Sequence, residues 1–219
     1  MKTLILIPCY NTHTYIYKLL TQLRLHTNCD ILVYDDGSSP AMNIDLKQFD
    51  GVILVRNETN MGKGYNIKKA LEFSRLKKYE YLITIDGDLQ HDPAEINKFI
   101  SYGIDYDFVL GSRKFQNPMP FHRRISNIVT SFIISTLATK KIEDSQCGYR
   151  KYKVSAVYIE NLKENGFLLE SEILLRNIKK NTIIKNVKIN TIYSGSKSSI
   201  NNISDTFNFI KLIFRYIIA

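Results

Sequence analysis

The sequence predicts an α/β fold in which a parallel sheet carries helices on both of its faces. Short apolar runs of strand length recur through the first half of the chain. Segments with the periodicity of amphipathic helices lie between them, and this alternation is typical of parallel sheets. The predicted strands are Thr3–Ile7, Ile31–Tyr34, Val52–Val55, Tyr81–Ile85 and Phe108–Leu110.

The intervening helices are predicted from their periodicity and, for one of them, from its start. Asp92-Pro93 is typical of a helix start, because Asp caps the first turn and Pro fits its geometry. Ligands of such sheets bind beyond the carboxyl ends of the strands, so the residues that follow each strand are the first candidates for a site. The predicted helices are Tyr15–Leu25, Gly64–Leu76 and Ala94–Ser101.

The pattern changes after residue 115, where the Pro-containing loop Asn117-Pro118-Met119-Pro120 begins. We therefore divide the chain into a first half, residues 1–115, and a second half, residues 116–219, that extends the fold with helices and a strand. At 219 residues both halves fit one compact domain. The predicted later elements are a helix from about Arg123 to Leu137, a helix near Phe167–Ile178, a strand at Ile183–Tyr193 and a mobile Ser/Asn-rich loop at Ser194–Ser204.

The net charge of +9 fits three kinds of partner, which are nucleic acid, an anionic membrane surface and phosphorylated substrates. The chain has no zinc-finger spacing and no aromatic-rich RNA-binding signature, which argues against nucleic acid. Its three cysteines, Cys9, Cys29 and Cys147, are odd in number and widely separated, so they predict no disulfide framework and fit a reducing cytoplasm. No signal-peptide pattern opens the sequence.

The C-terminal segment has two interpretations. No window reaches the roughly 20 apolar residues of a membrane span, and Phe207–Ala219 is interrupted by Lys211 and Arg215. A helix over about 204–219 could lie on a bilayer with its cations at the headgroups, or it could pack on the core of the protein. The first alternative predicts a peripheral protein at the inner face of the membrane.

Asp86 and Asp88 are the strongest candidates for chemistry. They flank Gly87 directly after a predicted strand, where both carboxylates can reach one site. Mg²⁺ and Mn²⁺ bind a few carboxylate oxygens and fill their remaining positions with water and substrate phosphates, so these acids and the amide of Gln90 could present a metal to a diphosphate. Taken alone, such a pattern is also explained by a surface loop or a helix cap.

Two further loops have both a structural and a functional interpretation. Asp35-Asp36-Gly37-Ser38 is strong turn chemistry, yet an Asp at the end of a strand could also accept hydrogen bonds from a nucleobase or a ribose. Asn60-Met61-Gly62-Lys63-Gly64 opens a helix, so its amides and Lys63 form either a cap or an anion site beside a nucleotide. It lacks the spacing of a P-loop.

These segments together resemble the family 2 glycosyltransferases, in particular the polyprenyl-phosphate sugar transferases similar to dolichyl-phosphate mannose and glucose synthases. The resemblance covers nearly the whole chain. It rests on Ile7-Pro8-Cys9-Tyr10-Asn11, Asp35-Asp36-Gly37-Ser38, Asn60-Met61-Gly62-Lys63-Gly64, Asp86-Gly87-Asp88-Leu89-Gln90-His91, Gly111-Ser112-Arg113, Arg123-Arg124 and Gln146-Cys147-Gly148-Tyr149-Arg150.

The resemblance implies a nucleotide-sugar-binding fold of the GT-A type, Mg²⁺ or Mn²⁺ as the cofactor, and inversion at the anomeric carbon. The first half would bind the nucleotide diphosphate-sugar and the second half the acceptor, a polyprenyl phosphate. The family usually has an acidic residue after the Asn of the first strand, and here Thr12 occupies that position. The implied site residues are Pro8, Tyr10, Asn11, Asp36, Lys63 and Asp86 for the nucleotide-sugar; Asp86, Asp88 and Gln90 for the metal; Arg113 at the reaction centre; and Arg123, Arg124, Ser126, Gln146 and Arg150 for the acceptor phosphate.

Transfer to a lipid phosphate needs no general base, because the acceptor oxygen is already ionised near neutral pH. The Gln-Cys-Gly-aromatic-basic segment is more similar to the glucosyl branch, which favours a UDP-sugar donor. A rival function is transfer to a saccharide hydroxyl, as in capsule or lipopolysaccharide assembly, and it would need a carboxylate base such as Glu170, Glu172 or Asp144. A non-catalytic nucleotide-sugar-binding subunit and a nucleotidyltransferase are alternatives of other classes. The sequence assigns no oligomeric state.

Overall fold

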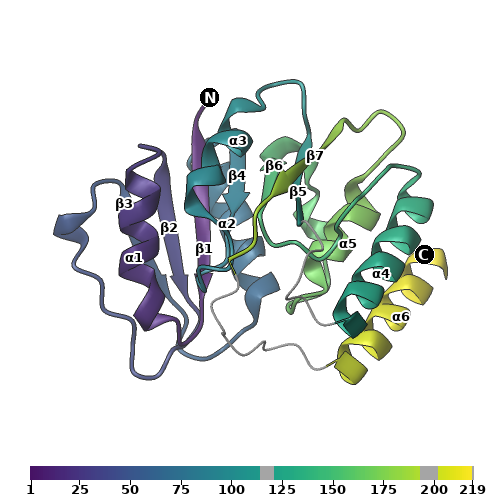
Figure 1. Ribbon diagram of the computed structural model, residues 1–219, viewed down its shortest axis with the longest axis horizontal. Helices are drawn as coiled ribbons and strands as arrows, with labels where there is room; N and C mark the ends of the chain where they lie inside the picture. The colour runs from purple at the N-terminus through teal and green to yellow at the C-terminus, as the bar shows by residue number, and fades with distance from the viewer. Residues whose placement is uncertain (114–120, 193–201, 219) are drawn as a thin grey trace.

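The computed structural model describes residues 1–113, 121–192 and 202–218, without the side chains of residues 121–123 and 202–205. Figure 1 shows one central sheet with helices on both of its faces. Within these residues the sheet has seven strands in the order β3-β2-β1-β4-β6-β5-β7. The strands are β1 (Thr3–Cys9), β2 (Asp30–Asp35), β3 (Val52–Arg56), β4 (Tyr81–Thr84), β5 (Phe108–Arg113), β6 (Arg150–Lys153) and β7 (Ile184–Ile189).

Helices of two kinds connect the strands. The α-helices are α1 (His13–Arg24), α2 (Lys63–Leu76), α3 (Ile96–Ser101), α4 (Phe121–Ala138), α5 (Leu169–Asn177) and α6 (Asn202–Ile218). The short 3₁₀-helices are η1 (Leu46–Gln48), η2 (Pro93–Glu95), η3 (Val154–Ala156) and η4 (Ile159–Asn161). The α/β class is confirmed, and every helix predicted in the first half is present with small changes at its ends.

The sheet is mixed, which corrects the prediction of a purely parallel one. Strand β6 runs antiparallel to both of its neighbours, β4 and β5. Its sequence, Arg-Lys-Tyr-Lys, has no apolar alternation, yet Arg150 and Lys151 are buried. The Arg150 guanidinium donates to three backbone carbonyls, and the Lys151 ammonium donates to the carbonyl of Tyr102. Because these hydrogen bonds make burial of the charges tolerable, a charged segment forms a central strand.

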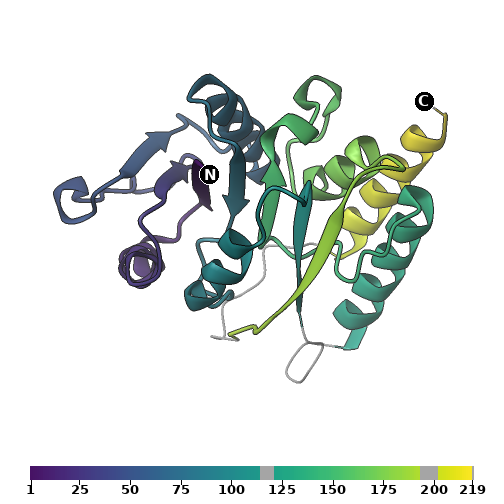
Figure 2. The same ribbon diagram turned by 90° about the horizontal axis from the view of Figure 1, so that it is seen from above.

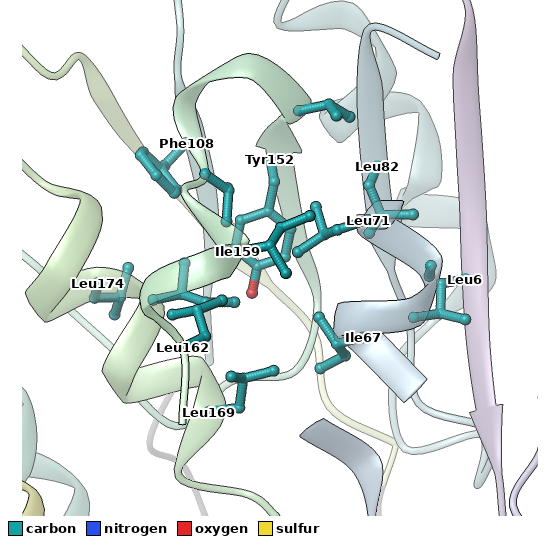
Figure 3. Close-up of a cluster of buried hydrophobic side chains, with 14 of the residues drawn as sticks. Leu6, Ile67, Leu71, Leu82, Phe108, Tyr152, Ile159, Leu162, Leu169 and Leu174 are labelled. Atoms are coloured by element: carbon teal, nitrogen blue, oxygen red, sulfur yellow. The ribbon is translucent and has the colours of Figure 1, made fainter. Parts of the chain in front are cut away.

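Alternate residues of each strand point to opposite faces of the sheet and build two separate cores. On β1, Ile5 and Ile7 face the cluster that contains α1 and α3, whereas Leu4 and Leu6 face the cluster that contains α2 and α5. Figure 3 shows the second cluster, where Tyr152 of β6 lies among leucines and isoleucines from several elements. Both faces are therefore covered by apolar contacts, as expected for an α/β sheet.

Two element boundaries differ from the prediction in ways that affect the site. Strand β5 continues to Arg113, so Gly111-Ser112-Arg113 belongs to the strand and not to a loop after it. Helix α6 begins at Asn202, so the end of the predicted loop Ser194–Ser204 is helical, while residues 193–201 lie outside the described part of the chain. The two halves share one sheet, because β6 of the second half lies between β4 and β5 of the first.

Helices α4 and α6 lie side by side at the end of the molecule farthest from β3 (Figures 1 and 2). They pack inward through Ile134, Ala138, Phe209 and Leu212, which belong to the α2 and α5 core. Among the described helices, none has the length and apolar character needed to cross a membrane.

Candidate active site

The carboxyl ends of β1, β2 and β4 meet at one edge of the sheet. The three strands are parallel, with Cys9 opposite Asp35 and Leu6 opposite Thr84. The backbone N–H of Asp36 donates to the carbonyl of Cys9 at 2.8 Å, so the loops that follow the strands also touch. The structure thereby brings together the segments after the three strands that the sequence selected as candidates.

The first acidic pair at this edge, Asp35 and Asp36, is buried and bonded within the protein. The carboxylate of Asp35 accepts hydrogen bonds from the backbone of Ser38 and Met42 and forms an ion pair with Arg56. Burial by itself would raise the pKa of Asp35, but the hydrogen bonds from Ser38, Met42 and Arg56 outweigh it and lower the pKa. Asp35 is therefore a charged anchor that fixes the turn after β2.

Asp36 orders the loop that leads into α2. Its carboxylate accepts hydrogen bonds from Asn57 Nδ2 at 2.7 Å and from the backbone N–H groups of Met61 and Gly62 at 2.9 Å each. Gly62 has φ +94°, and a Cβ there would lie 2.5 Å from the carbonyl oxygen of Asn165. These contacts show that the buried Asp36 carboxylate holds this loop in place, and its role in nucleoside binding stays a prediction.

The second acidic pair, Asp86 and Asp88, lies in a cluster with other charged groups. Lys63 Nζ lies 2.6 Å from Asp86 Oδ1 and 3.2 Å from Glu170 Oε1. His91 Nε2 lies 3.5 Å from Asp86 Oδ2. The Asp86 side chain keeps 30% of its surface exposed, in contrast to Asp35 at 0%. We call Lys63, Asp86, Asp88, His91 and Glu170 the acid cluster.

The pKa values of Asp86 and Asp88 are shifted in opposite directions. Burial would raise the pKa of Asp86, but Lys63 and His91 outweigh it and lower the pKa strongly. The pKa of Asp88 is raised, first by burial and then by the negative charge of Asp86, against a backbone hydrogen bond from Gln90. The pKa of Lys63 is raised, because Asp86 and Glu170 outweigh its burial. Asp86 is thus firmly ionised, whereas the pKa of Asp88 stays raised, because His91 and Lys63 only partly offset its burial and its repulsion from Asp86.

The acid cluster fits a divalent cation that arrives with its own phosphate ligands. The three carboxylates of the cluster outnumber its two groups that can carry positive charge, Lys63 and His91, so the cluster is negative before any ligand binds. No group of three or more His, Cys, Asp or Glu residues suited to a metal is found in the part of the chain that the structure describes. Mg²⁺ and Mn²⁺ do not need such a cage, since one or two carboxylates with water and phosphate oxygens suffice. Asp86, Asp88 and Gln90 are the residues that would hold the ion.

Segment 144–148 connects the acid cluster to the second half of the chain. The carbonyl of Gly148 accepts a hydrogen bond from Thr84 Oγ1 at 2.7 Å. A Cβ on Gly148 would lie 2.7 Å from Lys63 Nζ and closer still to Asp86 Oδ2, so a larger residue there would displace this ion pair. At the other end of the segment, Asp144 binds Arg113.

Arg113, at the end of β5, forms a two-point ion pair with Asp144. Its Nε and Nη2 lie 2.7 and 3.0 Å from the two carboxylate oxygens, and the Arg113 side chain is 17% exposed. Burial would raise the pKa of Asp144, but Arg113 outweighs it and lowers the pKa. Such a pair fixes the guanidinium in one orientation at the edge of the sheet. The structure therefore gives Asp144 a positioning role for Arg113 and not that of a free base.

The residues predicted for an acceptor phosphate fall into two groups. Arg124 and Ser126 are exposed on α4, and Gln146 is exposed beside it, with its amide donating to Thr130 of α4 at 3.1 Å. The side chain of Arg123 lies outside the described residues. The prediction that Arg150 binds the acceptor phosphate is corrected. Its guanidinium is fully buried and donates to the carbonyls of Ser145, Cys147 and Glu170.

Glu172 is also corrected as a catalytic candidate. It is buried, and its carboxylate accepts hydrogen bonds from the backbone of Lys163 and Glu164 and forms an ion pair with Arg176 at 2.8 Å. This carboxylate fixes the start of α5. Its oxygens are engaged by these protein donors, so it is not free to take a proton from a substrate.

The residues after β1 keep open surface. Tyr10 is 50% exposed, Asn11 is exposed with φ +55°, and Pro8 is partly buried. Asn11 exchanges hydrogen bonds with the loop after β2, donating its N–H to Ser38 Oγ and accepting from the N–H of Ser39, each at 2.9 Å. Tyr10 therefore exposes an aromatic ring at the edge of the sheet where the acid cluster also lies.

Sequence reasoning missed the contributions of Glu170, His91 and Gly148 to the acid cluster. Glu170 was a candidate base, but it instead binds Lys63. No local pattern could have paired Lys63 with Glu170, since more than a hundred residues separate them in the chain. Gly148 lies within a motif that the sequence had selected, yet its close approach to Asp86 is visible only in the structure.

Comparisons with known proteins agree on family and fold. A model of the family described as Glycosyl transferase family 2 matches residues 4–158. The chain is 36% identical over 190 residues to an uncharacterised protein of Methanocaldococcus jannaschii, covering 80% of this chain and 81% of that protein. It is 30% identical over 219 residues to a Methanococcus voltae protein named UDP-N-acetylglucosamine--dolichyl-phosphate N-acetylglucosaminyltransferase, covering 87% of this chain and 85% of that protein.

Among solved structures, the fold is similar to that of glucosyl-3-phosphoglycerate synthase from Mycobacterium tuberculosis in complex with Mn²⁺ and UDP-glucose. The TM-score is 0.70 at 14% identity, and the match covers 98% of this chain and 77% of that one. At this identity the likeness shows the fold alone. The GT-A type of α/β sheet is thereby confirmed.

Proposed function

Because the chain belongs to glycosyl transferase family 2, we propose that this enzyme transfers a sugar from a nucleotide diphosphate-sugar to a polyprenyl phosphate. The observation that carries the proposal is the acid cluster, whose unbalanced negative charge at the edge of the sheet suits a divalent ion with a diphosphate. Segment 144–148 joins this cluster to Arg113 and α4, where an anionic acceptor would bind.

The donor assignment rests on the edge of the sheet formed by β1, β2 and β4. Tyr10 and the loop after β2 lie at the same edge of the sheet as the acid cluster, so a nucleoside bound there could extend its diphosphate toward Asp86 and Asp88. The archaeal relative is named for a UDP-sugar, and the solved neighbour holds UDP-glucose with Mn²⁺. Both names support a UDP-sugar as the donor, and the metal complexes of the solved neighbour support Mn²⁺ or Mg²⁺ as the cofactor.

The acceptor assignment rests on charge. Arg113 is held at the edge of the sheet by Asp144, and Arg124 and Gln146 are exposed on and beside α4. Guanidinium groups bind phosphate with strong hydrogen bonds, so this region suits an anionic acceptor. The relative named for dolichyl phosphate supports a lipid phosphate.

The reaction would be a single displacement. An acceptor phosphate oxygen attacks the anomeric carbon, the bond from that carbon to the diphosphate breaks, and the nucleoside diphosphate leaves with the electron pair. The divalent ion, when bound, stabilises the negative charge of the leaving diphosphate. Lys63 keeps Asp86 ionised and oriented, and Arg113 draws the acceptor toward the donor against their mutual repulsion. No proton has to be removed from the acceptor.

The rival acceptor, a saccharide hydroxyl, requires a carboxylate base. Each of the three carboxylates considered for this role is bound to a cation: Glu170 to Lys63, Glu172 to Arg176 and Asp144 to Arg113. A carboxylate whose oxygens are held by a cation is not free to take a proton from a hydroxyl, so these contacts favour the phosphate acceptor.

The test is a transfer assay with purified protein, Mn²⁺ and radiolabelled UDP- and GDP-sugars. Parallel reactions contain detergent-dispersed polyprenyl phosphate, an oligosaccharide or 3-phosphoglycerate, and a fourth contains no acceptor. We expect label to enter the organic phase only with polyprenyl phosphate, and EDTA to abolish transfer.

Each other result has a defined meaning. Label in the oligosaccharide or phosphoglycerate product contradicts the lipid-phosphate acceptor but keeps the transferase. Tight donor binding with no product in any reaction identifies a non-catalytic binding subunit.

A further inference from the structure

Helix α4 exposes an apolar stripe on its outer face. Ile125, Ile128, Val129 and Phe132 are all exposed, with Phe132 at 71%. Their spacing of three and four residues places them on one side of the helix. The opposite side, with Asn127, Thr130, Ser131 and Ile134, is buried against the protein. The stripe is therefore not a part of the core.

Helix α6 repeats this arrangement from a distant part of the chain. Phe209 and Leu212 are buried, and Ile213 and Tyr216 pack against the same core. The outer face again consists of large apolar side chains, and Lys211 lies exposed beside them. Exposed apolar residues on α6 are Phe207, Ile210, Phe214, Ile217 and Ile218.

The two stripes form one surface, because α4 and α6 lie side by side in both views (Figures 1 and 2). We call it the outer apolar surface and define it by Ile125, Ile128, Val129, Phe132, Phe207, Ile210, Phe214, Ile217 and Ile218. Scattered exposed apolar residues are normal on a protein, but a contiguous apolar surface marks a binding site.

Charges around this surface indicate its partner. Helix α4 has an exposed Arg124 and no Asp or Glu, and α6 has an exposed Lys211 and Arg215 in its second half, where Arg215 also pairs with Glu164 at 3.0 Å. Apolar residues flanked by Lys and Arg are typical of helices that lie in the headgroup region of an anionic bilayer. A symmetric contact with a second copy would instead bring these cations together without acids on α4 to pair with them.

The outer apolar surface lies close to the residues proposed to bind the acceptor. The inner side of α4 touches segment 144–148, since Gln146 Nε2 donates to Thr130 Oγ1 at 3.1 Å and Ser131 Oγ lies 3.1 Å from Ser145 Oγ. The same segment binds Arg113 through Asp144. The outer apolar surface is therefore about one helix diameter, roughly 10 Å, from the residues proposed to receive the acceptor.

We propose that the outer faces of α4 and α6 together dock the protein on an anionic lipid bilayer and so place the acceptor side of the site at the headgroups. The apolar and basic residues of the surface support the contact with the bilayer. The role of this contact in acceptor binding rests on the function proposed above. Both helices lie on the membrane, with their inner sides still packed on the protein.

The test is flotation with vesicles, in the absence of donor and acceptor. Vesicles of phosphatidylcholine with phosphatidylglycerol are compared with vesicles of phosphatidylcholine alone. The variant Phe132→Glu/Phe214→Glu places one charge on each helix of the surface. The control variant Leu25→Glu/Leu76→Glu changes two equally exposed leucines elsewhere, each 76% exposed. Circular dichroism and thermal melting confirm that both variants fold.

We expect the wild type and the control variant to float with the anionic vesicles and to bind phosphatidylcholine vesicles less. The Phe132→Glu/Phe214→Glu variant should bind anionic vesicles more than about tenfold less, because two large apolar side chains no longer leave water. Failure of the wild type to float, or an equal loss in the control variant, overturns the proposal. Light scattering that shows a dimer broken by the same variant, with no vesicle binding, assigns the surface to a second copy.

Failure of this proposal is distinguishable from failure of the proposed function. Vesicle binding needs neither donor nor turnover, so it can succeed in an enzyme with a different acceptor. Transfer to a short-chain, detergent-dispersed polyprenyl phosphate should be similar in wild type and in Phe132→Glu/Phe214→Glu. Transfer to the same acceptor embedded in anionic vesicles should fall about tenfold or more.

Discussion

Two acidic pairs at the same edge of the sheet have opposite roles. Asp35 is the last residue of β2 and Asp36 follows it, whereas Asp86 and Asp88 come shortly after the end of β4. The first pair is buried and receives donors from Ser38, Met42, Arg56 and the loop before α2. At Asp88 one carboxylate oxygen accepts a backbone hydrogen bond from Gln90, and the pKa is raised.

The difference lies in how many donors the protein itself supplies. A carboxylate that is fully bonded inside the protein stabilises the fold, whereas a carboxylate short of positive charge is stabilised by a cation from outside. The sequence position of an acidic pair at the carboxyl end of a strand does not distinguish a structural pair from a functional one, because both pairs lie at such a position. The comparison therefore predicts a stability defect at one pair and a functional defect at the other.

The largest effect is expected for Asp88→Asn, which removes a metal ligand. Transfer should fall about a hundredfold or more, the scale at which loss of one electrostatic contact to a developing charge is felt. The melting temperature without metal should be unchanged or higher, because repulsion from Asp86 is relieved. Steady-state kinetics and thermal melting measure both. Asp105→Asn, at an exposed position, is the charge-matched control; wild-type activity in Asp88→Asn would contradict the metal assignment.

Asp35→Asn should have the opposite profile. Its amide cannot accept all the hydrogen bonds that the carboxylate receives, so a buried backbone N–H loses its partner at a cost of about 2 kcal/mol. Urea denaturation should show this loss in the free energy of unfolding, with Asp105→Asn close to wild type. If Asp35→Asn keeps full stability but loses transfer, the distinction between the two pairs fails.

Lys63→Met tests the internal cation of the acid cluster. Without the ammonium, Asp86 and Glu170 lose their shared partner, so the metal-free protein should bind Mn²⁺ several-fold more tightly while transfer falls about tenfold. Calorimetric titration with Mn²⁺ and the transfer assay measure the two changes. Lys69→Met on the same helix, whose ammonium pairs with exposed Glu72, should leave both unchanged. Weaker Mn²⁺ binding in Lys63→Met would show that the lysine supports the metal instead of competing with it.

The smallest effect is a pH dependence carried by Asp88. Its pKa is raised above the ordinary value of 3.8, so its contribution to stability is present below that value and is lost as the pH rises through the raised pKa. Mn²⁺ binds the ionised form and reverses this loss. The rise in melting temperature caused by Mn²⁺ should therefore shrink as the pH falls through the raised pKa. Asp88→Asn should show a smaller Mn²⁺ effect with no such trend; an identical trend in this variant would assign it to another group.

The sequence alone determined the alternation of strands and helices, and with it the edge where the site lies. Apolar periodicity is a local property, so strands such as Thr3–Cys9 and helices such as Lys63–Leu76 were predictable within a few residues. The metal-ligand candidates Asp86, Asp88 and Gln90 were also found locally, because they directly follow one strand. Strand β6 was not predicted from the sequence, because its buried charged residues interrupt the apolar pattern of a strand.

Only the tertiary structure decided which polar residues are available to a ligand. Arg150 and Asp36 have the same chemistry as groups in an active site, but they are buried and bonded to residues that lie twenty or more positions away in the chain. Glu172 is buried too, and its partners lie within nine positions of it. Lys63 meets Glu170, and Asp144 meets Arg113, across many residues of sequence. Hydrogen-bond satisfaction and desolvation depend on neighbours in space, and the order of residues along the chain does not record them.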